Sequence, residues 1–145
     1  MNTIEGMLHD IKILRSEVDR LLLHENLAAI PWTDYAGIST IVGWSSFLTK
    51  AISYAVIGKL VFVTYQFAGT SNATTSTFTL PYTSGAGMTT FSVNRAKDNS
   101  GAFVPGLASI NNASGTVNLY PNIISGAWTN SGTKATDGEF WYIRV

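Results

Sequence analysis

Apolar residues in the first thirty positions recur with the spacing of a helix. They fall three and four residues apart and fill every a and d position of three heptads: Ile4, Met7, Ile11, Leu14, Val18 and Leu21. Asn2 and Glu5 match a capping box at the start, whereas Pro31 disfavours helical backbone at Ile30. The pattern predicts one amphipathic helix within residues 1–30, which ends between residues 24 and 29.

Beyond Pro31, apolar and polar residues alternate with the period of a β-strand. The clearest run begins at Lys59, where one face carries Val61, Val63, Tyr65 and Phe67 and the other carries Thr64 and Gln66. Shorter runs lie at 77–80, 91–93, 117–119 and 141–145, separated by turn-forming glycine, asparagine and serine. Residues 31–145 are therefore predicted to form a mainly β domain, either a β-sandwich or a jelly roll.

The strand that begins at Lys59 has apolar residues on both faces at its start. Leu60 and Phe62 point away from the face that Val61 and Val63 share. A strand of this kind is covered on both sides. In an oligomer, the second cover would be a neighbouring subunit.

The heptad pattern leaves two arrangements open for the helix, packing on its own β domain or a parallel coiled coil with other copies. Asp10 and Arg15 occupy g and e positions that suit an ion pair between copies. Leu8 and Leu22 widen the apolar seam, which favours three strands, although β-branched a positions with leucine at d also suit a dimer. Gly6 weakens the helix by about 1 kcal/mol relative to alanine, so the β domain has to help hold the oligomer together.

Composition and charge narrow the function classes. The chain has 145 residues, nine Lys and Arg against nine Asp and Glu, and no cysteine. A chain without net charge does not attract nucleic acid, and disulfides and thiolate metal sites are excluded. Ser, Thr and Asn number 41 together, a polar but uncharged composition that suits extracellular or virion proteins. The most apolar stretch, 51–63, is broken by Lys59 and too short to span a bilayer, so no membrane insertion is expected.

Residues for catalysis or metal binding are sparse. Both histidines, His9 and His24, lie in the predicted helix at solvent-facing positions, away from any pocket of the β domain. Asp137 and Glu139 could share a strand face as paired carboxylates or calcium ligands, but a turn at Gly138 ahead of the last strand is favoured. The sequence predicts neither an enzyme nor a cofactor.

Aromatic residues beside amides indicate a candidate sugar-binding surface. Tyr120 is close to Asn122, and Trp128 is close to Asn130. An exposed ring packs on the apolar face of a sugar while neighbouring amides bond to its hydroxyls. Trp128 is the leading candidate because residues 125–132 have the composition of a loop, whereas core packing is the default for each other aromatic.

Several segments of the β domain resemble the C-terminal head domains of bacteriophage fibres and related virion appendages. The resemblance rests on residues 54–63 (YAVIGKLVFV), 69–72 (GTSN) and 79–82 (TLPY), and further on Trp128, 131–133 and 141–143. It covers about residues 32–145, and the preceding helix is similar to the short coiled-coil stalks of these proteins.

The resemblance implies a parallel homotrimer, with three helices in a stalk and three β-sandwich heads around its axis. Leu60 and Phe62 would join the six heptad residues at the interface. The trimer would be made in the host cytoplasm, reside on the virion, contact other virion proteins of the tail, baseplate or capsid, and bind a repetitive host surface by avidity.

Three functions follow as alternatives. The leading one is a non-enzymatic trimeric fibre or receptor-binding head that recognises a host surface, with carbohydrate as the expected ligand. The second is a capsid decoration or head-fibre protein that docks on the shell through its N-terminal helices. The third is a free monomeric module that resembles a lectin.

Overall fold

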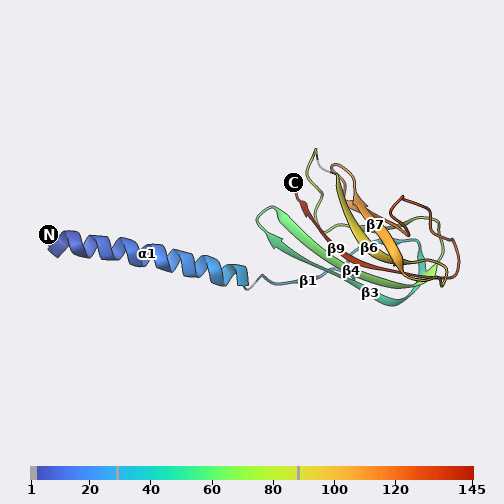
Figure 1. Cartoon of the computed structure of the whole chain (residues 1–145), viewed down its shortest axis with the longest axis horizontal. Coiled ribbons are helices and arrows are strands. Elements are labelled where there is room, and N and C mark those ends of the chain that lie inside the picture. Colours follow the sequence, from blue (N-terminus) through green and yellow to red (C-terminus); the bar gives the residue numbers. More distant parts are fainter. Residues whose placement is uncertain (1–2, 29, 88) are drawn as a thin grey trace. The chain divides into compact units, whose positions relative to one another are not determined.

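A computed structural model describes residues 3–28, 30–87 and 89–145 of the chain (Figure 1). The chain forms two compact units, Met1–Pro31 and Trp32–Val145. Over the described residues, the first unit holds one helix and the second is built from β-strands. The protein is therefore mainly β, with an N-terminal helix.

The helix α1 spans Thr3–Ala28, so its end lies inside the predicted range. Asn2 of the predicted capping box lies outside the described residues, as does the side chain of His24. His9 is exposed, as predicted. The exposed fractions of the six a and d side chains are 63% for Ile4, 59% for Met7 and Ile11, 63% for Leu14, 51% for Val18 and 56% for Leu21. Within the helical unit, this apolar stripe is uncovered.

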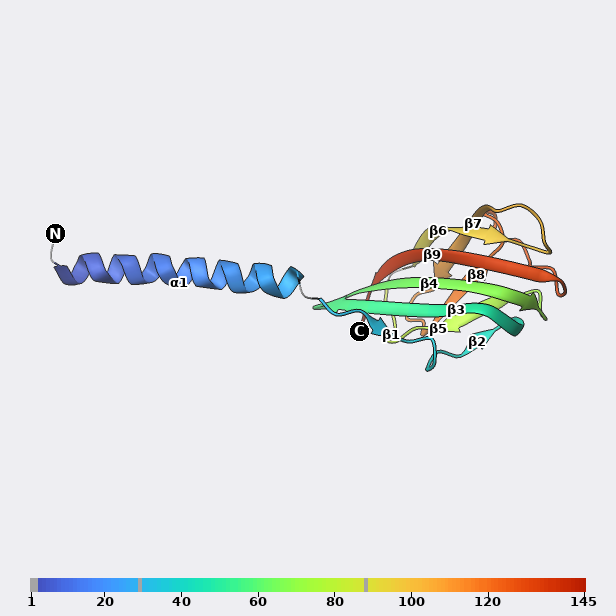
Figure 2. The same cartoon turned by 90° about the horizontal axis from the view of Figure 1, so that it is seen from below.

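The strands of the β unit pair antiparallel in one sheet, in the order β1-β3-β4-β9-β6-β7-β8-β5-β2. Their bounds are Thr33–Asp34 (β1), Ile41–Val42 (β2), Trp44–Ile57 (β3), Leu60–Ser71 (β4), Ser76–Thr79 (β5), Thr90–Lys97 (β6), Val104–Ile110 (β7), Thr116–Tyr120 (β8) and Thr133–Ile143 (β9). Figure 2 shows the long strands β3, β4 and β9 side by side.

The sheet curls so that its two edge strands, β1 and β2, belong to one short segment of the chain. After β1, the backbone N–H of Tyr35 donates to the Ile52 carbonyl on β3 at 2.8 Å, and its hydroxyl donates to the Leu80 carbonyl beyond β5 at 3.0 Å. The chain then pairs with β5 through β2 and enters β3 through Gly43. Gly43 has a φ of 94°, a left-handed conformation that glycine adopts without steric cost.

The curled sheet encloses a core rich in aromatic rings. The face assigned from the sequence is confirmed, because Val61, Val63, Tyr65 and Phe67 are between 0% and 4% exposed. Phe78 on β5 lies across the core from β4, with ring centroids 5.3 Å from Tyr65 and 5.6 Å from Phe67. Such offset and edge-on pairs add packing energy beyond the area they bury.

The longest strand, β3, lies in a segment for which the sequence pattern predicts no strand. Register shifts between Trp44 and Ser46 and between Phe47 and Thr49 break the alternation that would reveal it.

The turn predicted at Gly138 is wrong, because Asp137, Gly138 and Glu139 all lie within β9. Asp137 forms an ion pair with Arg95 on β6 at 3.0 Å. A Cβ atom at position 138 would lie 3.1 Å from the Tyr65 hydroxyl oxygen. The glycine therefore makes room for a buried side chain and does not reverse the chain.

Candidate functional site

The outer face of three neighbouring strands changes from apolar to polar along its length. On β4, Leu60 and Phe62 precede Thr64 and Gln66. β9 runs antiparallel to β4, so its polar residues, Asp137 and Glu139, come first and its apolar residues, Trp141 and Ile143, follow. On β6, Phe91 and Val93 precede Arg95 and Lys97. Phe62 pairs with Trp141 and Thr64 pairs with Glu139, so the apolar halves align.

The aligned apolar residues form a patch that we call the outer apolar face: Trp32, Leu60, Phe62, Phe91, Val93, Trp141 and Ile143. Among them, Trp32 is 55% exposed, Phe91 64%, Val93 67% and Trp141 51%. Trp32 directly precedes β1, which pairs with the end of β3. Exposed patches rimmed by polar residues mark binding surfaces, whereas single exposed apolar residues do not.

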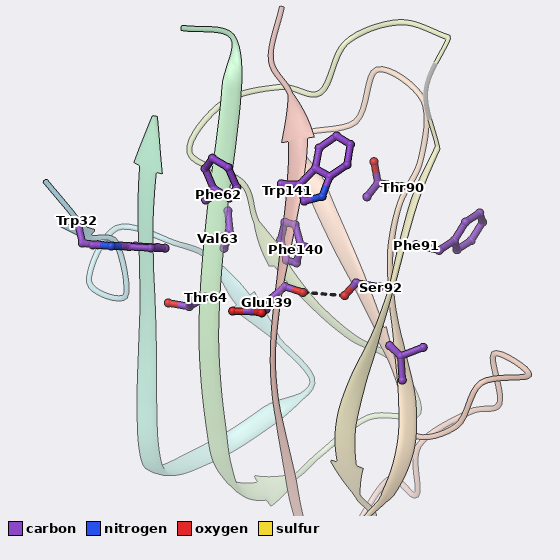
Figure 3. Close-up of a pocket in the computed structure, with 11 residues that line it drawn as sticks. Trp32, Phe62, Val63, Thr64, Thr90, Phe91, Ser92, Glu139, Phe140 and Trp141 are labelled. Atoms are coloured by element: carbon purple, nitrogen blue, oxygen red, sulfur yellow. Dashed lines mark hydrogen bonds between the residues drawn. The ribbon is translucent and has the colours of Figure 1, made fainter. Parts of the chain in front are cut away.

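A groove of about 490 Å³ runs through this face, lined by residues of β4, β9 and β6 and by Trp32. The backbone pairing of the two strands covers Arg95–Lys97, and nearer the apolar end the Ser92 hydroxyl donates to the Glu139 carbonyl at 2.6 Å. Figure 3 shows Phe62, Trp141 and Phe91 around this groove, with Trp32 on the far side of Phe62. At the groove, β6 and β9 are therefore joined by the side-chain hydrogen bond of Ser92 and not by backbone pairing.

The residues that line the groove offer contact surface. Its aromatic lining residues are Trp32, Phe62, Phe91 and Trp141 together with the buried Phe140, and Glu139 is the one carboxylate among its lining residues. Those lining residues contain neither an imidazole nor a thiol. The arrangement suits burial of apolar area against another surface, at roughly 25 cal/mol for each Å² removed from water.

Of the predicted interface residues in the β domain, both lie in the outer apolar face. Leu60 and Phe62 are half-buried on β4. The six heptad residues lie on α1 in the other unit. Sequence reasoning missed Trp32, Phe91, Val93 and Trp141 as members of the face. The signal available for Trp141 was the run 140–143, which is apolar on both faces in the same way as 60–63.

The prediction that Trp128 is exposed is wrong. Its side chain is 2% exposed, and its indole Nε1–H donates to the Leu119 carbonyl at 2.7 Å. The Lys134 amine lies 5.1 Å from the centre of the indole ring. The ring is therefore enclosed by the β unit even though its neighbours form a loop, and its faces are not open to a sugar.

The other three candidate sugar-binding residues are not brought together around Trp128. Asn130 is exposed, whereas Tyr120 is half-buried and lines a separate hollow with residues 125–127. The Asn122 side-chain oxygen accepts hydrogen bonds from the backbone N–H groups of Ile124 at 3.2 Å and Gly126 at 2.9 Å. Asn122 therefore shapes its own loop.

Comparisons with known proteins add no relative: no protein-family model matches the chain, and no curated protein matches it. Across the part of the chain that the structure describes, no group of three or more His, Cys, Asp or Glu side chains could hold a metal ion. The described helical residues include no segment long and apolar enough to cross a membrane.

Proposed function

We propose that this chain is a self-associating attachment protein of a bacteriophage virion. The helices form a parallel trimeric coiled coil, and the β unit serves as a sandwich or jelly-roll-like head that recognises carbohydrate on a host surface. The observation that carries the proposal is the uncovered stripe of heptad side chains on α1, each at least 51% exposed. The resemblance of residues 32–145 to fibre heads supplies the virion context.

Association of the helices in a coiled coil would stabilise them, because it buries their heptad side chains. Most of the stability of a helix in a protein comes from packing of its apolar face, and Gly6 lowers the intrinsic stability of α1 by about 1 kcal/mol relative to alanine. Burying an aliphatic side chain contributes about 1.5–3 kcal/mol, and the stripe offers six of them in every copy. Ile11 and Val18 occupy central a positions, so a charge there would be buried in the seam.

The outer apolar face supports the same proposal from the β unit. Trp32, at its edge, follows the last helical residue, Ala28, by four residues in sequence. Joining the helices therefore raises the effective concentration of the faces for one another. Leu60, Phe62 and Trp141 would then bury their exposed area between heads, which is the second cover that the sequence predicts for β4.

The proposal is tested by the solution mass of the full chain, measured by light scattering coupled to size exclusion. We expect a trimer for the wild type and a smaller species for the double variant Ile11→Asp, Val18→Asp. A monomeric wild type would overturn the proposal and favour the free lectin-like module. Immunogold labelling of particles then separates the two virion roles, because a capsid location would identify a decoration protein.

A further inference from the structure

A second groove, of about 600 Å³, lies across the outer face of the β unit at the end opposite Trp32. Its walls come from the start of β3, the end of β4, the start of β9, the end of β6 and the loop after β6. We call it the distal groove. It is lined by Ser46, Phe47, Leu48, Ala68, Gly69, Thr70, Lys97, Phe103, Thr133, Lys134 and Ala135.

The distal groove has an apolar wall on an otherwise polar half of the sheet. Leu48 is 89% exposed and Phe103 is 46% exposed. The guanidinium carbon of Arg95 lies 4.2 Å from the centre of the Phe103 ring, so one face of this ring is already covered by a cation. An aromatic ring held in this way offers a rigid platform for the C–H face of a sugar.

Hydroxyl groups line the same groove beside this wall. Ser46 donates to the Thr70 side-chain oxygen at 3.0 Å, and the Thr133 hydroxyl lies 2.7 Å from that of Ser100. Each hydroxyl has one proton and two lone pairs, so these pairs keep acceptor capacity for a ligand. Hydroxyls on a polyol complement such a surface.

The charge of the groove is positive. Arg95 is compensated by Asp137 at 3.0 Å, and the Lys134 amine is turned away between the indole rings of Trp44 and Trp128, at 4.6 and 5.1 Å. Lys97 is half-buried, with its amine 5.8 Å from the Phe103 ring centre, and no carboxylate occurs among the lining residues of the groove. An anionic group on a ligand would therefore form a charge-assisted hydrogen bond with the Lys97 amine.

We propose that the distal groove binds a saccharide that carries an anionic group, either a carboxylate or a phosphate. The sugar ring packs on Phe103, its hydroxyls bond to Ser46, Thr70 and Thr133, and Lys97 pairs with the anion. The inference deepens the proposed function, since it rests on the head recognising carbohydrate, and it gives that recognition a site other than the outer apolar face.

The test is isothermal titration calorimetry of the full chain with three probes: a galacturonic acid oligomer, the matched neutral galactose oligomer and the same galactose oligomer carrying phosphate monoesters. We expect the wild type to bind at least one anionic probe about tenfold more tightly than the neutral oligomer, and the difference to shrink at high salt. Tighter binding of the phosphorylated oligomer would assign the anion as phosphate, and tighter binding of the uronate would assign it as carboxylate.

Two variants locate the binding. Lys97→Gln should remove the preference for the anionic probe, whereas Lys59→Gln, in the exposed turn at the opposite end of the unit, should leave it unchanged. Phe103→Ala should weaken binding of charged and neutral oligomers alike, and circular dichroism checks that its fold is retained. Equal affinity of wild type and Lys97→Gln for every anionic probe would overturn the inference.

The outcomes keep this inference apart from the proposed function. A trimeric wild type that binds none of the three probes would overturn the ligand proposed for the distal groove and would still support the proposed trimer. A monomeric wild type whose binding still depends on Lys97 would overturn the proposed trimer and would still support the binding site in the distal groove. Equal affinity for the charged and neutral oligomers would overturn the anionic class of ligand.

Discussion

Lys134 is the residue whose environment departs furthest from that of an ordinary surface lysine. Its side chain is 1% exposed, and its amine has no hydrogen-bond partner in the part of the chain that the structure describes. The indole rings of Trp44 and Trp128 face the amine. Burial lowers the pKa of Lys134 to about 8, against an opposing effect from the Asp98 carboxylate.

We expect stability to rise with pH through the titration of Lys134. Between about pH 8 and pH 10.5 the folded chain has released this proton while the unfolded chain still binds it, so the free energy of unfolding increases with pH. The expected gain is on the order of 2 kcal/mol. Urea unfolding from pH 7 to 9.5 measures the slope, and Lys134→Met should flatten it.

Two tyrosines give the opposite slope at higher pH, which sets the upper limit of that measurement. Burial raises the pKa of Tyr65 and of Tyr142 well above the ordinary value of 10.0. Above about pH 10 the unfolded chain loses these protons first, so stability falls. An identical rise in wild type and Lys134→Met below pH 9.5 would contradict the assignment to Lys134.

The burial of Trp128 and Lys134 could not be predicted from their neighbours in sequence. Residues 125–132 have the composition of an exposed loop, and Lys134 follows that loop at the start of β9. The third partner of the cluster, Trp44, lies on β3, far away in the chain. A contact made by distant strands leaves no periodic signal, whereas the alternation of 61–67 reports its own burial directly.

At the level of elements, predictability follows the regularity of the strand. β4 alternates without interruption from Leu60 to Phe67, and its faces were predicted correctly. β3 has two register shifts within its first six residues, and it was missed. The outer apolar face was predicted only at Leu60 and Phe62, because its other members are contributed by β6, β9 and the segment before β1, whose order in the sheet differs from their order in the chain.

The two halves of β4 provide a matched pair of variants. Phe62→Ser should weaken the trimer, since it removes an aromatic side chain from the proposed interface while the inward-facing Val61 and Val63 stay in place. Gln66→Ser changes the same outer face at its polar end and should leave the association unchanged. Sedimentation equilibrium gives both association constants. Equal constants for the two variants would exclude this face from the interface.

For the whole molecule, the proposed function predicts that loss of the trimer weakens attachment to a surface without changing the affinity of each binding site. Ile11→Asp with Val18→Asp should abolish attachment to a surface densely coated with ligand, because the avidity of three joined heads is lost. The affinity of each head for the free ligand should stay the same, since these residues lie in the other compact unit. Surface plasmon resonance at high and low ligand density measures the first quantity, and calorimetry measures the second. Unchanged attachment at high density would show that one head suffices.

The register of the sheet brings both ends of the β unit to one side. Thr33 pairs with Tyr54 near the end of β3, and Leu60, after the β3–β4 turn, pairs with Ile143 near the end of β9. At the other side, Thr70 pairs with Thr133, which follows loop 121–132. A reporter fused after Val145 would therefore crowd the outer apolar face, whereas a peptide inserted beside Ile124, which is 83% exposed, would be displayed clear of it. The exposed stretch at Ile123 and Ile124, ahead of the buried Trp128, is thus the place to graft a foreign epitope or affinity tag onto this scaffold.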